Sequence, residues 1–249
     1  MRETPRAEPP QPRPHRAVTH TTGTSGPGTP HRSDGRPPHT PRGVRRPDPH
    51  GRPGTTPPVP GRPALFSALV ALALMTWQVL VRGPLTGLDE RVSRALVDTV
   101  PRPLSELASD LGNMTVALPV LGCAMAYAVW RGRRAAALYA GLAMAAVPLL
   151  VVPLKEWTAR PGPLEPWAQG YYPSGHTATA AVAYFGAALL VSNRLVPVAA
   201  VLTAVTGTGL VLRGYHWPLD VLASLCLSLL VLGVSSSCTR RSCSRTATG

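Results

Sequence analysis

Two residues near the end of the sequence, His216 and Asp220, stand four positions apart in the segment LRGYHWPLD. Four residues is close to one turn of an α-helix, so the carboxylate can bond one nitrogen of the imidazole ring. The other ring nitrogen then presents its lone pair, which is the arrangement of an oriented histidine nucleophile. The same pair could also supply two ligands to a metal ion, but the sequence shows no third ligand nearby.

Two further residues, His176 and Lys155, could take part in the same chemistry. Lys155 is the single lysine among 25 lysine and arginine residues, and beyond the N-terminal 63 residues the only histidines are His176 and His216. A histidine can donate a proton to a leaving group, and a fixed lysine charge favours a transferring phosphoryl group. Ser174 and Gly175 precede His176 in YYPSGHT. A helix that begins there offers free backbone N–H groups to phosphate oxygens.

Long apolar segments must position these residues. Each segment has roughly 17 to 20 residues, about the length that crosses 30 Å of hydrocarbon. We predict membrane spans at about residues 64–81, 114–130, 135–154, 176–192, 195–212 and 217–234. Lys155, His176 and His216 all lie at the outer ends of these spans, and ionisable groups near the membrane core usually mark function. The predicted fold class is all-α, a six-transmembrane-helix bundle with a disordered basic N-terminal tail.

The N-terminal region differs in composition from the rest of the chain. Residues 1–63 contain 17 of the 29 prolines and almost no large apolar residue. Such a segment cannot bury a core, so we predict a disordered Pro- and Arg-rich tail over residues 1–63. A transmembrane domain over residues 64–236 and a short basic tail over residues 237–249 complete the predicted organisation.

The formal net charge of +13 indicates the topology of the chain. Six spans would place the basic N-terminal tail, the arginines at 131–134 and 194, and those at 240–245 on one side of the membrane. The positive-inside rule then puts both termini in the cytoplasm and the loops 82–113 and 155–175 outside. We therefore predict a multi-pass protein of the cell membrane with an outward-facing site and no nucleic-acid partner.

The two outer loops carry secondary signals. Apolar residues at Leu88, Val92, Leu96 and Val100 predict an amphipathic helix that lies along the interface and shapes or covers the site. Aromatic residues gather at the same membrane face, where we expect them to form an interfacial belt. They are Trp157, Trp167, Tyr171, Tyr172, Tyr215 and Trp217.

The segments KEWTARPGP, YYPSGHT and LRGYHWPLD resemble the three motifs of the type 2 phosphatidic acid phosphatase superfamily, KxxxxxxRP, PSGH and SRxxxxxHxxxD. The resemblance implies an enzyme that hydrolyses a lipid phosphate or diphosphate, such as a phosphatidic acid-type lipid or polyprenyl diphosphate. It further implies that no metal or other cofactor is used and that a phosphohistidine forms. In this reading His216 is the nucleophile, Asp220 orients it and His176 is the general acid.

Two arginines of the family pattern are displaced in this sequence. The expected positions hold Gly162 and Leu210, and the available substitutes are Arg160 and Arg213. We expect phosphate to be bound by a set of five residues, namely Lys155, Arg160, Ser174, Gly175 and Arg213. The alternative is a membrane protein that binds a lipid phosphate with a catalytically disabled site. A haloperoxidase, whose core the superfamily shares, agrees less well with a core that is apolar throughout.

Overall fold

The computed structural model describes the backbone of residues 61–246 and the side chains of residues 61–238. The predicted disordered tail over residues 1–63 lies almost wholly outside this range. Every regular element described is helical, as predicted. The helices are α1 (Arg62–Leu80), α2 (Pro84–Leu96), α3 (Arg102–Asp110), α4 (Met114–Trp130), α5 (Arg134–Thr158), α6 (Gly175–Val191), the short 3₁₀ helix η1 (Asn193–Leu195), α7 (Val196–Leu212) and α8 (Pro218–Thr246).

Six of these helices coincide with the six predicted spans. Helices α1 and α5, the stretches α3–α4 and η1–α7, and α8 as far as Cys238 are long and apolar enough to cross a membrane. Helix α6 is a shorter apolar helix of 17 residues. The predicted bundle of six apolar helices is therefore confirmed, and it identifies a multi-pass membrane protein.

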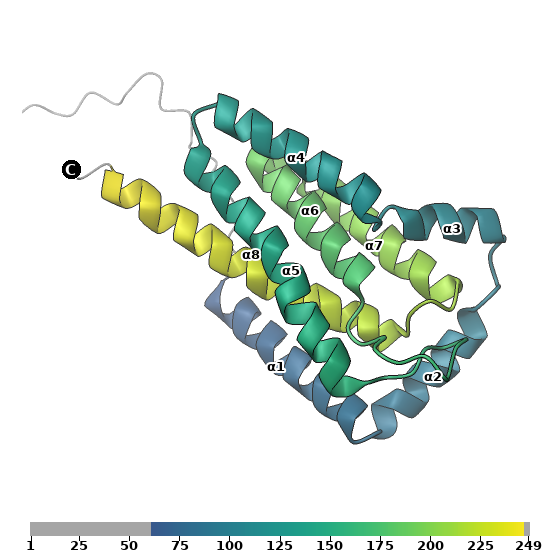
Figure 1. The fold of residues 1–249 in the computed structure, drawn as a ribbon. Coiled ribbons are helices and arrows are strands. Elements are labelled where there is room, and N and C mark those ends of the chain that lie inside the picture. The colour runs from purple at the N-terminus through teal and green to yellow at the C-terminus, as the bar shows by residue number, and fades with distance from the viewer. Residues whose placement is uncertain (1–60, 247–249) are drawn as a thin grey trace, which may run out of the picture. The chain divides into compact units, whose positions relative to one another are not determined.

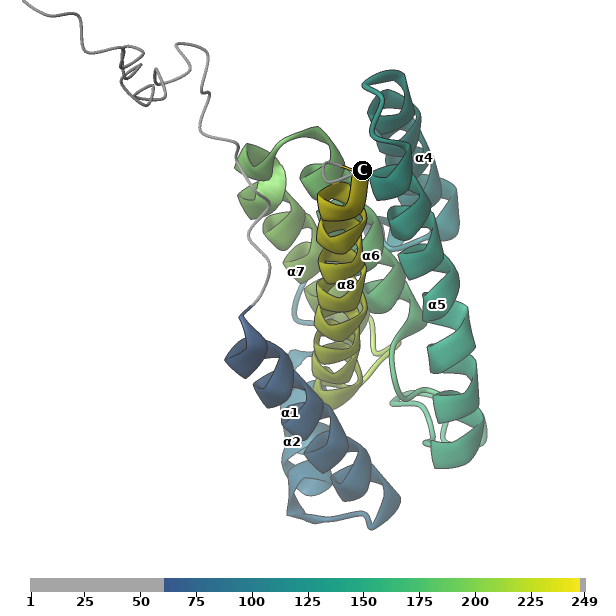
Figure 2. The same cartoon turned by 90° about the vertical axis from the view of Figure 1, so that its left-hand side faces the viewer.

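Helix α6 is the central helix of the bundle and packs against α4, α5, α7 and α8 (Figure 1). Its sequence, GHTATAAVAYFGAALLV, is rich in small residues, which allow neighbouring helices to approach closely. Its middle turns are buried on all sides, as expected for a helix that is apolar all round. Helix α8 lies between α1 and α5 (Figure 2). The start of α6 is therefore held in place by packing against four helices.

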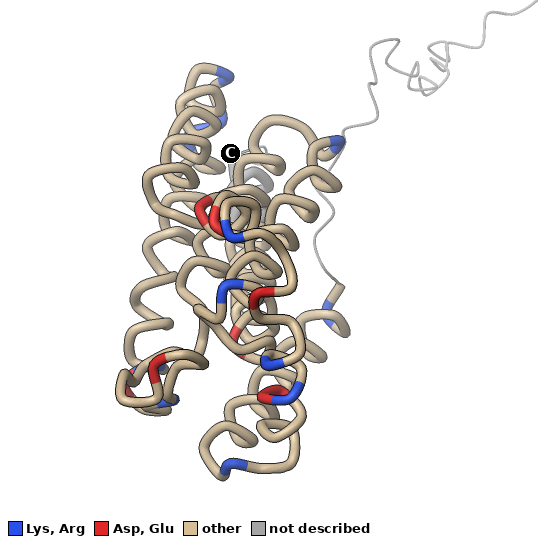
Figure 3. The backbone as a smooth tube through the Cα atoms, turned by 90° about the vertical axis from the view of Figure 1, so that its right-hand side faces the viewer, with Lys and Arg blue, Asp and Glu red and all other residues tan. Residues whose placement is uncertain are grey.

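The connections divide between the two ends of the bundle (Figure 1). The α4–α5 and α6–α7 turns lie at the end where α8 finishes, and basic residues mark these turns (Figure 3). Helices α2 and α3, the 159–174 loop and the α7–α8 turn lie at the opposite end, where acidic and basic residues are mixed. The residues predicted to perform chemistry thus come together at the second end.

The loop between α1 and α4 contains two helices, α2 and α3, although only the first was expected from the sequence. Helix α2 directs Leu88, Val92 and Leu96 away from the protein, whereas Asp89 and Ser93 are buried. It packs against α1, α7 and α8. Its polar side therefore faces the bundle, and this orientation brings the Asp89 carboxylate into the interior.

Candidate active site

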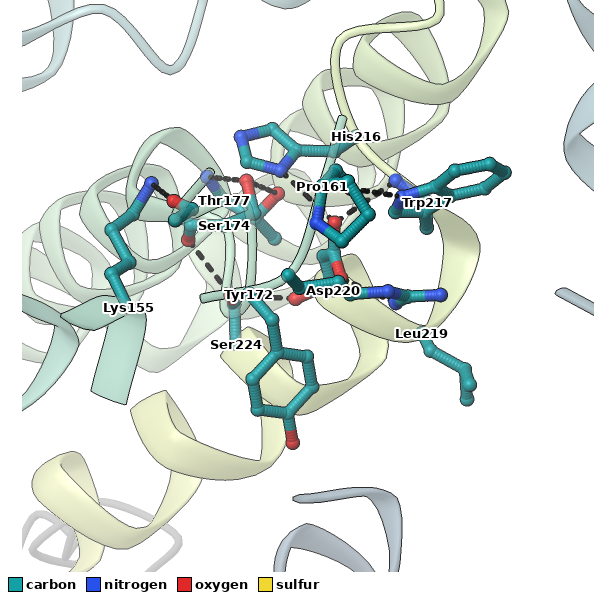
Figure 4. A network of polar contacts seen from close by, with 12 residues as sticks. Lys155, Pro161, Tyr172, Ser174, Thr177, His216, Trp217, Leu219, Asp220 and Ser224 are labelled. Carbon is teal, nitrogen blue, oxygen red and sulfur yellow. Dashed lines mark hydrogen bonds and ion pairs between the residues drawn. The ribbon is translucent and has the colours of Figure 1, made fainter. Parts of the chain in front are cut away.

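The α7–α8 turn positions His216 and Asp220. Helix α8 begins at Pro218, since proline is tolerated in a first helical turn. The Nδ1 atom of His216 lies 3.3 Å from Oδ2 of Asp220, and this oxygen also accepts the Trp217 backbone N–H at 3.0 Å (Figure 4). The His–Asp distance is slightly longer than that of a typical hydrogen bond from a ring N–H to an oxygen. With Nδ1 donating to the carboxylate, Nε2 of His216 is left with its lone pair.

The first turn of α6 is fixed directly to α8. Ser174 caps α6, because its Oγ accepts the Thr177 backbone N–H at 3.3 Å. Its own backbone N–H donates to the Asp220 carbonyl at 3.2 Å, and its carbonyl accepts the Ser224 hydroxyl at 2.7 Å (Figure 4). The start of α6 and the turn that carries the His–Asp pair therefore form one connected unit.

A cavity of about 480 Å³ lies beside this unit and is lined by His216, His176 and Lys155 together. Lys155 reaches the cavity from the last turn of α5, where its Nζ donates to the Gly170 carbonyl at 2.7 Å. Gly175 also lines the cavity. The N–H groups of Gly175 and His176 belong to the first turn of α6 and have no partner within that helix, so they can bind an anion.

The opposite wall of the cavity is apolar. It is formed by Met114 at the start of α4 and by Val147, Pro148, Val151 and Val152 of α5. Met114 is 58% exposed and Val152 is 48% exposed, so this wall continues onto the outer surface of the bundle. The cavity therefore combines a cationic end with an apolar side that opens between two membrane helices.

Arg160 contacts the His216–Asp220 pair through the Asp220 carboxylate and does not line the cavity. Its Nη1 donates to Oδ1 of Asp220 and its Nη2 to Oδ2 of Asp89, each at 2.6 Å. The guanidinium also stacks on the Trp217 ring, 5.2 Å from the ring centre. From the sequence, Arg160 is expected to bind phosphate, but its terminal nitrogens are bonded to two carboxylates. Because Arg160 does not line the cavity, the role predicted for it in binding phosphate stays a prediction.

The structure does not bring Arg213 to the cavity. Its Nη2 donates to the Tyr215 hydroxyl at 3.1 Å, and the guanidinium lies over the Tyr215 ring. Leu210, at the family's arginine position, is only 2% exposed. The role predicted for Arg213 in binding phosphate stays a prediction, and it requires the side chain to turn away from Tyr215.

The loop after α5 leaves no room for a side chain at Gly162, the other family position. The ring of Tyr171 lies against Gly162, where any side chain would collide with it. Tyr171 lines the cavity, and its ring meets that of His216 edge-on with centres 5.8 Å apart. Its hydroxyl donates to Glu165 at 2.9 Å. Burial is the main cause that raises the Tyr171 pKa, and the hydrogen bond with Glu165 raises it further. An aromatic ring thus occupies the space beside Gly162.

Two of the six aromatic residues expected in an interfacial belt are core residues instead. Tyr172 is fully buried with its hydroxyl 2.8 Å from that of Thr76, and burial raises the Tyr172 pKa to about 12. Trp217 is 8% exposed and donates its ring N–H to the Pro161 carbonyl at 2.8 Å. Each of these two side chains has a polar group that forms a hydrogen bond inside the protein. The pattern of aromatic residues along the sequence does not reveal these hydrogen bonds.

Asp89 is a site residue that was not identified from the sequence. It is 4% exposed, and its Oδ1 accepts the backbone N–H of Leu219 at 2.8 Å. Burial raises the pKa of its carboxyl, while the Arg160 guanidinium and the Leu219 N–H act in the opposite direction. The signal in the sequence was an acidic residue on the predicted amphipathic helix, but nothing in the sequence indicates which side of that helix is buried.

Among the residues that the structure describes, no group of three or more His, Cys, Asp or Glu side chains is placed to hold a metal ion. His216 and Asp220 form a pair, and the second side-chain partner of that carboxylate is Arg160. Independence from metal ions stays a prediction that needs a direct test.

Comparison with known proteins supports the resemblance seen in the motifs. Residues 136–243 match the family described as the PAP2 superfamily. A solved structure, that of a transmembrane PAP2 type phosphatidylglycerolphosphate phosphatase from Bacillus subtilis, superposes with a TM-score of 0.64 at 21% sequence identity. The match covers 72% of this chain and 96% of that chain. No curated protein sequence matches the chain. The predicted resemblance is confirmed, and Asp89 lies outside the residues matched by the family.

Proposed function

We propose, from the match of residues 136–243 to the PAP2 superfamily, that the chain is a membrane phosphatase that hydrolyses a lipid phosphate or diphosphate. The observation that carries this proposal is one cavity lined by His216, His176 and Lys155. The buried carboxylate of Asp220 is hydrogen-bonded to His216. A nucleophile, a proton donor and a fixed positive charge are the groups that phosphoryl transfer requires.

The first step transfers the phosphoryl group to the protein. The lone pair on Nε2 of His216 attacks phosphorus while the bond from phosphorus to the leaving oxygen breaks. His176, in its protonated form, gives its proton to that oxygen, so an alcohol leaves from a monoester and a lipid monophosphate leaves from a diphosphate. Asp220 stabilises the positive charge that develops on the His216 ring.

The second step returns the protein to its starting state. A water molecule attacks the phosphorus of the phosphohistidine, and His176, now neutral, accepts the proton of that water. The bond from phosphorus to Nε2 breaks and inorganic phosphate leaves. In both steps the Lys155 ammonium and the first-turn N–H groups at Gly175 and His176 stabilise the charge on the phosphoryl oxygens.

The apolar wall of the cavity favours a lipid substrate over a soluble phosphate ester. The polar groups gather at one end of the cavity, whereas Met114, Pro148 and Val152 form a side that reaches the bundle surface. A substrate whose phosphate binds at the polar end can leave its hydrocarbon chain between α4 and α5, in contact with membrane lipids.

The distribution of charge supports a site that faces outside, with both termini in the cytoplasm. We expect a cysteine at Trp167, which is 78% exposed in the 159–174 loop, to react with an impermeant reagent on intact cells. A cysteine at Arg194, in the α6–α7 turn, should react only after the cells are permeabilised. Both variants are made in a background whose four cysteines are replaced by alanine. The reverse labelling pattern would contradict this topology.

The proposed activity is tested by phosphate release from purified full-length protein in detergent. We expect release from phosphatidic acid or polyprenyl diphosphate, with full activity in EDTA. Orthovanadate should inhibit, because it can adopt the five-coordinate geometry of the transition state. Activity that EDTA abolishes and a divalent metal restores would contradict the metal-independent mechanism.

The alternative function, binding of a lipid phosphate without turnover, draws on the positions of the two arginines. Arg160 is bonded to carboxylates and Arg213 to Tyr215, so neither contacts the cavity that holds His216. If the protein binds these lipids or vanadate and releases no phosphate from any of them, this alternative replaces the phosphatase.

A further inference from the structure

A chain of buried charges connects α2 to the reacting histidine. Asp89 is bonded to Nη2 of Arg160, and Nη1 of Arg160 is bonded to Asp220, each at 2.6 Å. The other oxygen of Asp220 faces Nδ1 of His216 at 3.3 Å. All four residues are buried, with exposed fractions of 6% or less. The contacts therefore run without interruption from the outer helix to the ring of His216.

We propose that Asp89 is a positioning residue for the reaction, acting on His216 through Arg160 and Asp220. This inference rests on the proposed phosphatase function. Asp89 does not touch the cavity. Its effect is to fix the carboxylate that in turn fixes the imidazole.

Asp89 holds Asp220 by two routes. In the first route, Asp89 fixes the plane of the Arg160 guanidinium. This plane sets the direction from which Arg160 donates its hydrogen bond to Oδ1 of Asp220. Through its own Oδ1, Asp89 accepts the N–H of Leu219, the residue before Asp220 in the first turn of α8. That N–H has no partner within the helix, so the carboxylate also serves as a cap supplied by another helix.

The charge of Asp89 matters as well as its shape. The positive charge of Arg160 is shared between the carboxylates of Asp89 and Asp220. Without Asp89, the full charge of Arg160 would act on Asp220 alone. The Asp220 carboxylate would then stabilise positive charge on the His216 ring less well while the phosphohistidine forms. A buried ion pair is by itself weak evidence for stability, and this one ends at the carboxylate that contacts His216.

Two substitutions separate charge from packing. Asp89→Asn keeps the size of the side chain and an acceptor for Leu219 but removes the charge and the oxygen that accepts from Arg160. Asp89→Glu keeps the charge and both oxygens and adds one methylene group. We expect Asp89→Asn to lower kcat by about ten- to a hundredfold with KM changed by less than about twofold. Asp89→Glu should retain more activity than Asp89→Asn. A residue needed only for packing would give the opposite order, and that order would overturn the proposal.

Glu90→Gln is the matched control. Glu90 is the next residue of α2, and it forms a surface ion pair with Arg94 at 3.7 Å. The kcat and KM of this variant for dioctanoyl phosphatidic acid should stay within about twofold of the wild type, as expected for an exposed pair. A loss equal to that of Asp89→Asn would show a general effect of altering α2 and would overturn the proposal.

A double variant tests whether Asp89 acts through Asp220. In the Asp220→Asn background, Asp89→Asn should change kcat by less than about twofold, because the path to His216 is already broken. Losses that multiply would overturn the proposal.

A measurement without turnover separates this inference from the proposed function. Diethyl pyrocarbonate modifies a neutral imidazole, and the modified peptide is quantified by mass spectrometry. We expect His216 to react at least about threefold more slowly in Asp89→Asn than in Glu90→Gln, because its ring is less well oriented. Equal rates would overturn the role of Asp89. If the wild type releases no phosphate from any lipid phosphate, the proposed function fails while this comparison still decides the inference.

Discussion

Replacing His216 with alanine should abolish phosphate release. The side chain that would form the bond to phosphorus is lost, and the charge of Lys155 and the α6 N–H groups cannot supply a nucleophile. We expect initial rates with dioctanoyl phosphatidic acid to fall by at least about four decades, as when the central member of a catalytic group is removed. The measurement is release of inorganic phosphate by protein purified in detergent.

The control for His216→Ala is the melting temperature in the same detergent, which shows whether the bundle remains folded. The His216 ring lies at the cavity wall rather than in the middle of the bundle, so the folded state should persist. A tenfold loss of rate corresponds to an increase of roughly 1.4 kcal/mol in the activation free energy. A folded variant whose loss is tenfold or smaller would contradict His216 as the nucleophile.

Replacing Asp220 with asparagine should produce the second largest loss. The amide has nearly the size of the carboxylate, but it carries no charge and has only one oxygen to accept hydrogen bonds. Arg160, Trp217 and His216 all donate to this carboxylate. We expect kcat to fall by about two to four decades, by analogy with carboxylates that orient a catalytic histidine.

Stability should fall together with kcat in Asp220→Asn, because Arg160 loses a buried partner. Breaking a buried pair costs about 3–5 kcal/mol. Ser224→Ala is the matched control, since the Ser224 hydroxyl donates to the carbonyl of Asp220 and not to its carboxylate. It should lower the melting temperature and leave kcat within about tenfold. An Asp220→Asn variant with wild-type kcat would contradict the orienting role.

The spans could be predicted because their lengths and composition are set by the membrane. The predicted span at 114–130 has the bounds of α4, and the predicted span at 176–192 begins one residue after the start of α6. In α6 the start is also marked by Ser174, whose capping bond is local in sequence. Helix α3, with the sequence RPLSELASD, has nine residues, which is shorter than the window of about 11 residues or more over which helical periodicity is read.

The orientation of α2 could not be predicted by the rule used for soluble proteins. There an apolar stripe faces the core, but here Leu88, Val92 and Leu96 are exposed and Asp89 is buried. In a membrane protein the outer surface contacts lipid, so apolar residues can face outward and ionisable ones inward. The sequence pattern is the same in both cases.

The partners of the two arginines depend on side-chain directions that spacing does not set. Counting from Lys155 places Arg160 near the motif position, but its second carboxylate comes from Asp89, 71 residues earlier. Arg213 shares a helical face with Leu210, yet the direction of its long side chain is set by Tyr215. Neither contact follows from spacing along the sequence, whereas His216 with Asp220 is a local pair that does.

The most direct test of the account is to trap the phosphorylated protein. Purified full-length protein is mixed with lipid phosphate labelled with ³²P and quenched in alkali within one turnover, because phosphohistidine is stable in base. Peptide mapping should find the label on His216, and His216→Ala should carry none. Phosphate release by the wild type with no trapped label, or with label on another residue, would contradict the account.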